Sequence, residues 1–401
     1  MAVVEEAVSL DRSRLEEIQT ALRELDLDGW LLYDFRGNNP VSARLLGLPA
    51  MSRRYFVLIP SRGDPIAVTH RIEQQAWRSW IGENRTYLSW RELETQVREL
   101  LARRGVLAME YSVEDGVPYV DRIPAGVMEL IRSSGVMVRS SADLVSIFYS
   151  RWSEEGLASH ERAASIVAET ARAAFEQIGQ AIRRGETPTE LSIRDWIREE
   201  FSRRGLHVGA DAIVAVNANA ANPHYAPSAE AHASIRANDV VLIDLWGKES
   251  EAAIYADQTW MGFVGSELPE RLRTIWEAVR DARDAAIERA VSGWRSGDEV
   301  TGAAIDDAAR EVITSRGFGE QFIHRTGHSI DTELHGSGPN IDNLETRDTR
   351  RLIVGVGFSI EPGIYLPGEV GFRSEVDVYV SPDGPRVTTP NPQRDPFFIQ
   401  P

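Results

Sequence analysis

Apolar residues in the first part of the chain recur with helical and strand periods in turn. In residues 11–25, four of them fall on one face of a predicted helix: Leu15, Ile18, Leu22 and Leu25. Residues 37–40, rich in Gly, Asn and Pro, are expected to form a loop. Further helices are predicted at 91–105 and 126–135, and strands at 29–35, 55–60, 65–70, 106–111 and 136–141. This alternation is typical of an α/β layer domain, which we expect over residues 1–150.

From residue 151 onward the pattern changes to long helices that flank short apolar runs. Helices are predicted at 153–185, 189–206, 269–293 and 297–317, a strand at 211–216 and a hairpin within 240–264. His160 is expected on the exposed face of its helix, and residues 390–401 are expected to pack on the surface as a tail. The sequence therefore predicts a second domain, residues 151–401, in which helices cover a sheet.

Composition narrows the class of protein. The chain has 401 residues and 42% hydrophobic content, enough for two ordinary globular cores. A formal charge of −17 argues against a nucleic-acid partner, and the lack of cysteine excludes disulfides and a thiol nucleophile. The first fourteen residues are acidic and do not resemble a signal peptide, and no apolar run is long enough to span a membrane. We expect a soluble cytoplasmic protein.

The segment Phe322 to His335, FIHRTGHSIDTELH, concentrates histidine. Three of the eight histidines lie in it, His324, His328 and His335. If the segment is a strand, His324 and His328 point to the same side, and His335 returns toward them across a turn. Neutral imidazole is a common metal ligand and proton shuttle. A chance cluster on a solvated loop would look the same, so the flanking sequence decides between the two readings.

Four acids flank this segment within β-prone apolar sequence. They are Asp244 in VVLID, Asp257 in IYADQTW, Glu361 in FSIEPGIYL and Glu375 in GFRSEVDVYV. An ionised carboxylate in apolar surroundings is costly unless it is paired or binds a metal. Four carboxylates with an imidazole form a hard ligand set that suits Mn²⁺, Co²⁺, Mg²⁺ or Zn²⁺, with enough charge for two divalent ions.

The order Asp244, Asp257, His328, Glu361, Glu375 resembles that of the pita-bread metallopeptidases. The motifs RTGH, IEPGIY and GFRSE carry the resemblance, which covers residues 150–390 and is nearest to the Xaa-Pro peptidase branch, prolidase and aminopeptidase P. It implies an N-terminal creatinase-type α/β domain followed by a C-terminal pita-bread α+β domain with a curved antiparallel sheet. It also implies a homodimer, because the N-terminal domain typically supports dimerisation.

The resemblance assigns roles to the metal ligands. Asp244 would chelate one metal, and His328 with Glu361 would bind the other. Asp257 and Glu375 would bridge the two ions, with Mn²⁺ as the expected metal and Co²⁺ or Zn²⁺ as alternatives. Glu361 would also transfer a proton from water to the leaving proline nitrogen.

Other residues gain expected roles in the same way. His335, together with His224 in the segment NPHY, would stabilise the oxyanion, and His324 would line the proline pocket or contact the substrate carboxylate. Arg373 would pair with a liganding acid, and Tyr365 is a weaker candidate for support of this kind. The chain departs from the family pattern in a longer turn between Asp244 and Asp257 and at three further positions: Ser329, Asp331 and Gly336.

The expected function is hydrolysis of Xaa-Pro bonds in a proline-containing dipeptide or short peptide. A prolidase, cleaving dipeptides, is preferred to an aminopeptidase P acting on longer peptides, and the two share their catalytic residues. A non-catalytic binding module on the same fold would tend to lose ligands, whereas this chain keeps all five. Another metal-dependent hydrolase or lyase on this fold stays open because the departures around His328 are unexplained.

Overall fold

The computed structural model describes residues 10–400 apart from residues 103 and 208. It divides into two units, Met1–Tyr149 and Ser150–Pro401, one residue before the boundary placed from the sequence. The expectation of no signal peptide falls mostly on residues 1–9, which lie outside the described residues. No helix in the described part of the chain is both long and apolar enough to cross a lipid bilayer.

The N-terminal unit is a six-stranded mixed sheet with the strand order β4-β3-β2-β1-β5-β6. Its strands are β1 (Gly29–Asp34), β2 (Tyr55–Pro60), β3 (Ile66–His70), β4 (Glu83–Tyr87), β5 (Val106–Met109) and β6 (Met137–Ser140). Its helices are α1 (Arg12–Glu24), α2 (Pro40–Leu46), η1 (Arg71–Trp77), α3 (Trp90–Leu101), η2 (Val113–Asp115), α4 (Ala125–Ser133) and α5 (Ala142–Phe148).

Both faces of this sheet are buried, which explains the unbroken apolar run of β1. Trp30 and Leu32 pack on one face with the apolar stripe of α1, while Leu31 and Tyr33 pack on the other with α3 and α4. The predicted loop at residues 37–40 was wrong in part, since α2 begins at Pro40. The side chain of Asn39 caps that helix by accepting a hydrogen bond from the Ser42 N–H, and proline is well tolerated in a first helical turn.

The second unit contains four long helices, two short 3₁₀ turns and ten strands among the described residues. The helical elements are α6 (Glu154–Arg183), α7 (Glu190–Arg204), η3 (Asn219–Ala221), α8 (Glu270–Ser296), α9 (Gly302–Ser315) and η4 (Gly319–Gln321). The strands are β7 (Ile213–Val216), β8 (Val240–Gly247), β9 (Ala256–Val264), β10 (Ser329–Ile330), β11 (Gly357–Ile360), β12 (Gly363–Leu366), β13 (Val370–Arg373), β14 (Val376–Ser381), β15 (Gly384–Val387) and β16 (Phe397–Ile399).

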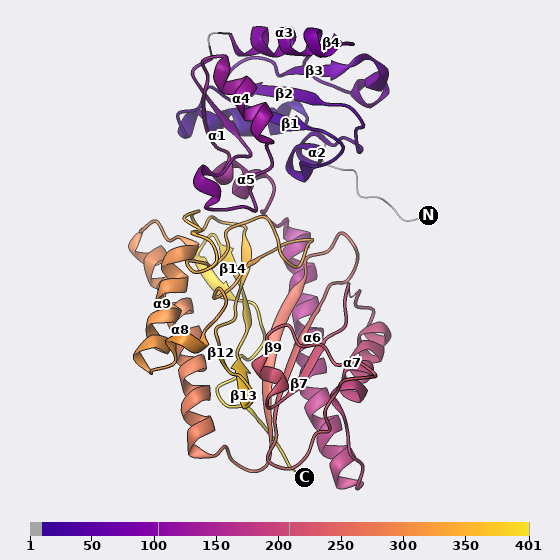
Figure 1. The fold of residues 1–401 in the computed structure, drawn as a ribbon, viewed down its shortest axis with the longest axis vertical. Helices are drawn as coiled ribbons and strands as arrows, with labels where there is room; N and C mark the ends of the chain where they lie inside the picture. Colours follow the sequence, from indigo (N-terminus) through magenta and orange to yellow (C-terminus); the bar gives the residue numbers. More distant parts are fainter. Residues whose placement is uncertain (1–9, 103, 208, 401) are drawn as a thin grey trace. The chain divides into compact units, whose positions relative to one another are not determined.

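These strands form two four-stranded sheets and a separate hairpin. The sheet orders are β16-β9-β8-β7 and β10-β11-β14-β15, and β12 pairs with β13. Within this unit α6 and α7 flank the strands on one side and α8 and α9 on the other, as Figure 1 shows. Two buried clusters follow this layering. One packs α6, α7 and β16 against one face of β7–β9, and the other packs α8, α9 and β11–β14 against the opposite face of β7–β9.

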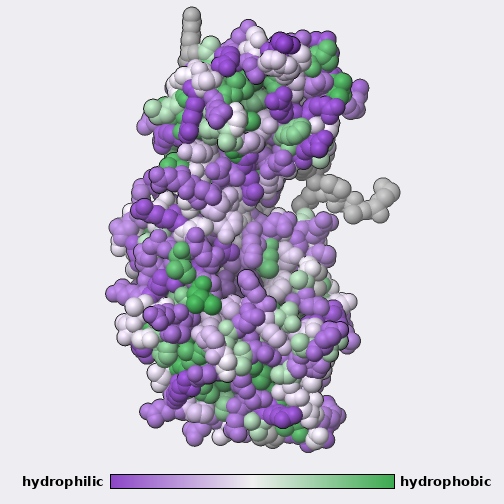
Figure 2. All heavy atoms as spheres, in the orientation of Figure 1, coloured by the Kyte–Doolittle hydropathy of each residue, from purple (hydrophilic) through white to green (hydrophobic). Residues whose placement is uncertain are grey.

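Two local predictions in this unit were wrong. The tail is not a surface appendage, because β16 adds a parallel strand to β9 and buries Ile399. Residues 322–335 do not form a continuous strand, because within them strand structure is confined to Ser329–Ile330. The surface itself is mostly hydrophilic on the face seen in Figure 2, with hydrophobic side chains in small separate groups, as the large charge excess requires.

Candidate metal centre

The hairpin β8–β9 brings Asp244 and Asp257 to one face of its sheet. In the antiparallel register Asp244 lies opposite Thr259, and Trp246 lies opposite Asp257. Because side chains alternate along a strand, Asp244, Asp257 and Thr259 project to the same side. The preceding residue, Ile243, points the other way, into the core beneath α6 and α7.

The second sheet supplies the other three candidate ligands from strand ends that lie side by side. His328 immediately precedes β10, Glu361 follows β11 and Glu375 precedes β14. The Ser359 N–H donates to the His328 carbonyl (2.8 Å), and Ile360 at the end of β11 pairs with the first residue of β14. Sheet register therefore places these residues at neighbouring positions.

The glycine of the RTGH motif allows this close approach. A Cβ atom at Gly327 would lie 1.9 Å from the Ser359 carbonyl oxygen, so no other residue fits there without moving the backbone. The Glu361 N–H in turn donates to the Thr326 carbonyl (2.6 Å). The loop before His328 is thus held against β11 although it is not itself a strand.

Ligand atoms from both sheets converge. His328 Nε2 lies 3.4 Å from Asp257 Oδ2 and 3.4 Å from Glu361 Oε1. Asp257, His328 and Glu375 each offer a ligand atom within 4.8 Å of the others, and all three side chains are buried. Glu375 Oε2 accepts a hydrogen bond from the Thr259 hydroxyl (2.7 Å), whereas its Oε1 has no hydrogen-bond partner among the described residues.

The carboxylates repel one another in these surroundings. Burial, followed by repulsion from Asp244 and Glu361, raises the pKa of Asp257 well above its ordinary value. Burial and the neighbouring acids raise the pKa of Glu375 in the same way. Burial also raises the pKa of Asp244, and the nearby guanidinium of Arg373 offsets part of that rise. Protein groups alone therefore leave this cluster short of positive charge.

Positive neighbours favour the ionised form of Glu361. Burial alone would raise its pKa, but the charges of His328, His324 and Arg373 outweigh burial and leave the pKa lowered. Arg373 ion-pairs with Asp244, and its Nε donates to the Thr259 hydroxyl (2.9 Å).

Tyr365 connects Arg373 to His324. The Arg373 Nη1 lies 3.3 Å from the Tyr365 hydroxyl, which is 2.8 Å from His324 Nε2. Burial raises the pKa of Tyr365 to about 12, so the phenol stays protonated. The structure thus brings His324 close enough to act electrostatically on Glu361, although the segment that carries His324 is not a strand.

His335 and His224 stand at the edge of the cluster. The ring of His335 packs edge-on against His328, with 4.4 Å between ring centroids. His335 reaches solvent, yet the surrounding protein and the neighbouring His328 lower its pKa to about 4. His224 is exposed, and it is close enough for its charge to contribute to that lowering.

The residues present fit divalent metal ions. Buried acids with raised pKa values, an unpartnered Glu375 Oε1 and a buried imidazole form a set that cations would neutralise. The donors are four carboxylates and one histidine, as expected for hard divalent ions. Arg373 ion-pairs with Asp244, as an outer-sphere partner of a metal-binding carboxylate would.

Comparison with known proteins assigns the family. Residues 159–382, more than half of the chain, match the model for metallopeptidase family M24. The chain belongs to metallopeptidase family M24. The family predicted from the sequence is therefore confirmed.

Relatives of this M24 chain carry peptidase names. It is 36% identical over 209 residues to the Xaa-Pro dipeptidase of Lactobacillus delbrueckii subsp. lactis, a match over 52% of each chain. The chain thus spans about half the length of the curated relative that it matches. The dipeptidase PepE structure from Mycobacterium ulcerans superposes with a TM-score of 0.70 over 97% of this chain and 98% of that one, at 23% identity.

A further solved structure extends the comparison. The X-Pro aminopeptidase from Thermotoga maritima superposes with a TM-score of 0.57 at 26% identity, over 95% of this chain and 100% of that chain. Such neighbours establish the pita-bread fold of the second unit, as predicted from the sequence.

Sequence reasoning missed a buried network behind Asp257 in this M24 chain. His160 is fully buried, so its expected exposure was wrong. Its Nδ1 lies 2.7 Å from the Tyr255 carbonyl and its Nε2 2.7 Å from the Thr388 hydroxyl. Asp377 lies 3.9 Å from His160 and accepts the backbone N–H of Asp257 (3.0 Å).

A signal for this burial was present in the helical period. His160 stands three and four residues before Ala163 and Ala164, so it continues the apolar stripe of α6.

The departures from the family pattern shape the loop that carries His335. The Ser329 hydroxyl accepts the Gly338 N–H (2.9 Å), and Asp331 accepts the N–H groups of Glu333 and Ser337. In the longer turn after β8, buried Lys248 donates to the carbonyl of Thr332 (2.7 Å). The turn and the histidine loop therefore support each other.

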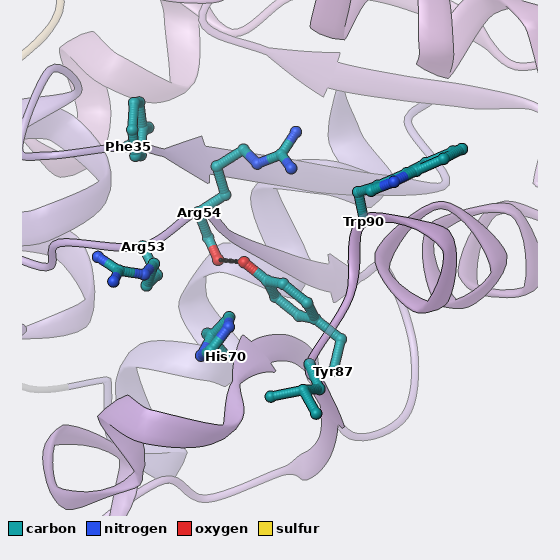
Figure 3. Close-up of a pocket in the computed structure, with 7 residues that line it drawn as sticks. Phe35, Arg53, Arg54, His70, Tyr87 and Trp90 are labelled. Atoms are coloured by element: carbon teal, nitrogen blue, oxygen red, sulfur yellow. Dashed lines mark hydrogen bonds between the residues drawn. The ribbon is translucent and has the colours of Figure 1, made fainter.

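The N-terminal unit contains a separate pocket of about 450 Å³. Among the residues that line it, the Tyr87 hydroxyl donates to the Arg54 carbonyl (2.8 Å), as Figure 3 shows. None of its lining residues is acidic, so it offers no hard ligand set for a divalent ion. The lining residues are Phe35, Arg53, Arg54, His70, Tyr87, Leu88 and Trp90.

Proposed function

We propose that this chain is a metal-dependent peptidase that hydrolyses the Xaa-Pro bond of dipeptides. The observation that carries the proposal is the convergence of Asp257, His328 and Glu375, with Asp244 and Glu361 beside them. The name of the Lactobacillus delbrueckii relative, a Xaa-Pro dipeptidase, supports the choice of substrate.

Five residues would hold the metal ions. They are Asp244, Asp257, His328, Glu361 and Glu375, which the two sheets bring together. When bound, two divalent cations would supply Lewis-acid chemistry, polarising the scissile carbonyl group and acidifying a water molecule. Mn²⁺ is the proposed ion because the ligand set is dominated by carboxylate oxygens, and Co²⁺ and Zn²⁺ are the alternatives.

The chain's own groups would move the proton and orient the substrate. Glu361, whose lowered pKa keeps it ionised, would accept a proton at a carboxylate oxygen and deliver it to the leaving proline nitrogen. His335 and His224 would donate hydrogen bonds to the oxyanion, which requires that a ring N–H of each point toward the substrate. His324, held by Tyr365, would face the proline side of the substrate.

The test is hydrolysis of Ala-Pro beside Ala-Pro-Ala by protein stripped of metal and then supplied with Mn²⁺, Co²⁺ or Zn²⁺. The proposal expects Ala-Pro cleavage that depends on added metal and is lost in Asp257→Asn. Asp281→Asn, on the partly exposed surface of α8, is the matched control and should retain activity. Absence of metal-dependent turnover of either peptide would reject the proposal.

One observation favours a second candidate. The structural likeness to an X-Pro aminopeptidase at 26% identity leaves longer peptides as an alternative substrate class. Faster cleavage of Ala-Pro-Ala than of Ala-Pro would favour that alternative. A homodimer and a cytoplasmic location stay predictions from the sequence.

A further inference from the structure

A buried glutamate organises the loop that carries His224. Glu190, the first residue of α7, is 0% exposed. Its carboxylate accepts the Val216 N–H (2.7 Å) and the Ala233 N–H (2.6 Å), one at each end of the loop 217–232. The same carboxylate accepts the Tyr225 hydroxyl (2.6 Å) next to His224 in sequence. One side chain therefore fixes both ends of the loop and its middle.

Further contacts hold the loop in place. The Asn219 side-chain amide also donates to the Glu190 carboxylate, at 2.9 and 3.0 Å. A Cβ atom at Gly371 would lie 1.9 Å from the Ala220 carbonyl oxygen, so the 3₁₀ turn η3 is pressed directly on β13. Strand β13 ends at Arg373, which ion-pairs with Asp244. The loop is thus attached at one side to the strand that supports the acidic cluster.

The chemistry of this anchor requires a carboxylate. Every group that forms a hydrogen bond with the Glu190 carboxylate donates it. A carboxylate suits these donors because in its ionised form it only accepts hydrogen bonds, and it can accept about four. Its position in the first turn of α7 adds a favourable interaction with the helix dipole. A glutamine would turn an NH₂ group toward one of these donors and leave it unpaired.

We propose that Glu190 is the positioning residue that holds His224 at the edge of the metal centre. This inference rests on the proposed function, in which His224 donates to the oxyanion. Glu190 touches neither substrate nor metal, and it acts through the loop. Its removal leaves the ligands in place and lets the His224 ring leave the position that the reaction needs.

The test compares kinetics on Ala-Pro for the metal-loaded full-length protein and its variants. Glu190→Gln should lower kcat about 10- to 100-fold, as small displacements of catalytic groups do, with KM changed less than about twofold. His224→Ala should lower kcat at least as much. The double variant should be no slower than His224→Ala, because Glu190 acts only through His224.

A matched control separates positioning from stability. Glu110 is another fully buried glutamate, and it accepts hydrogen bonds from Trp30, Asn39 and Ser141 in the N-terminal unit. Glu110→Gln should lower stability while kcat stays unchanged. An equal loss of kcat in Glu190→Gln and Glu110→Gln would overturn the proposal. So would a double variant of Glu190→Gln and His224→Ala in which the two factors of kcat loss multiply.

Amide hydrogen exchange supplies a readout that is independent of activity. Residues 217–232 should exchange faster in Glu190→Gln and not in Glu110→Gln. If the wild-type protein does not cleave Xaa-Pro peptides, the proposed function fails, and unchanged exchange would in addition refute the anchoring. If Glu190→Gln does not fold, Tyr225→Phe replaces it, because this variant removes one of the donors to Glu190. Tyr225→Phe must then lower kcat in the wild type and cause no further loss of kcat in His224→Ala.

Discussion

Replacing Arg373 by methionine should strongly destabilise the metal-free protein. The side chain is 5% exposed and ion-pairs with buried Asp244. Its Nε donates to Thr259 at 2.9 Å and its Nη1 to Tyr365 at 3.3 Å. Methionine fills similar volume but leaves the Asp244 carboxylate buried without its counter-charge.

The structure sets the size of this effect. Removing one partner of a buried ion pair costs about 3–5 kcal/mol, because the other charge is left desolvated. Asp244→Asn alone leaves the Arg373 charge unpaired and should also be costly. The double variant removes both charges, so its loss should be smaller than the sum of the single losses by at least about 2 kcal/mol.

Urea unfolding of the metal-free variants measures these differences. The matched control is Arg316→Met, which breaks the more exposed pair with Asp281 (40% and 32% exposed side chains) and should cost less than about 1 kcal/mol. Protonation of Asp244 removes the unpaired charge, so the decrease in unfolding free energy caused by Arg373→Met should become smaller as the pH falls. A loss no larger than that of the control, or strictly additive losses, would refute the assignment of Arg373 as the counter-charge of Asp244.

Three further outcomes are expected. Chelation should lower the melting temperature, because the acids then repel one another. Mn²⁺ at a hundred times its Kd should restore about 2.7 kcal/mol of unfolding free energy in the wild type but less in Asp257→Asn. An equal gain in both proteins would exclude Asp257 as a ligand. Burial lowers the pKa of His160 from 6.5, its value in the unfolded chain, to about 4. The contribution of neutral His160 to the free energy of unfolding should therefore be fully present above pH 6.5 and should fall by about 2 kcal/mol by pH 5. The decrease of the unfolding free energy between pH 6.5 and 4, measured by urea unfolding, should be smaller in His160→Gln. An identical decrease in both proteins would contradict this role of His160. Glu361→Gln should lower kcat by about 10²- to 10⁴-fold as expected for loss of a general base, and near-normal turnover of Ala-Pro would remove Glu361 from that role.

The local pattern determined much of the architecture. The helical stripe of Leu15, Ile18 and Leu22 and the apolar run of β1 depend on neighbours within a few residues, so the elements could be predicted directly. Likewise, carboxylates inside strand-like apolar sequence at Asp244 and Asp257 indicated a site, because burial of a charge needs compensation wherever the fold places it.

Tertiary structure decided which of these residues meet. Arg373 pairs with Asp244, and Glu190 accepts hydrogen bonds from four groups. His160 is buried against Thr388. Each of these contacts joins residues far apart in sequence. His324 reaches the centre from a loop rather than from a strand, because Tyr365 and not strand alternation fixes its ring. These contacts follow from the register of two sheets and the packing of helices on them. Such long-range geometry is set by the whole core, and no local period in the sequence carries it.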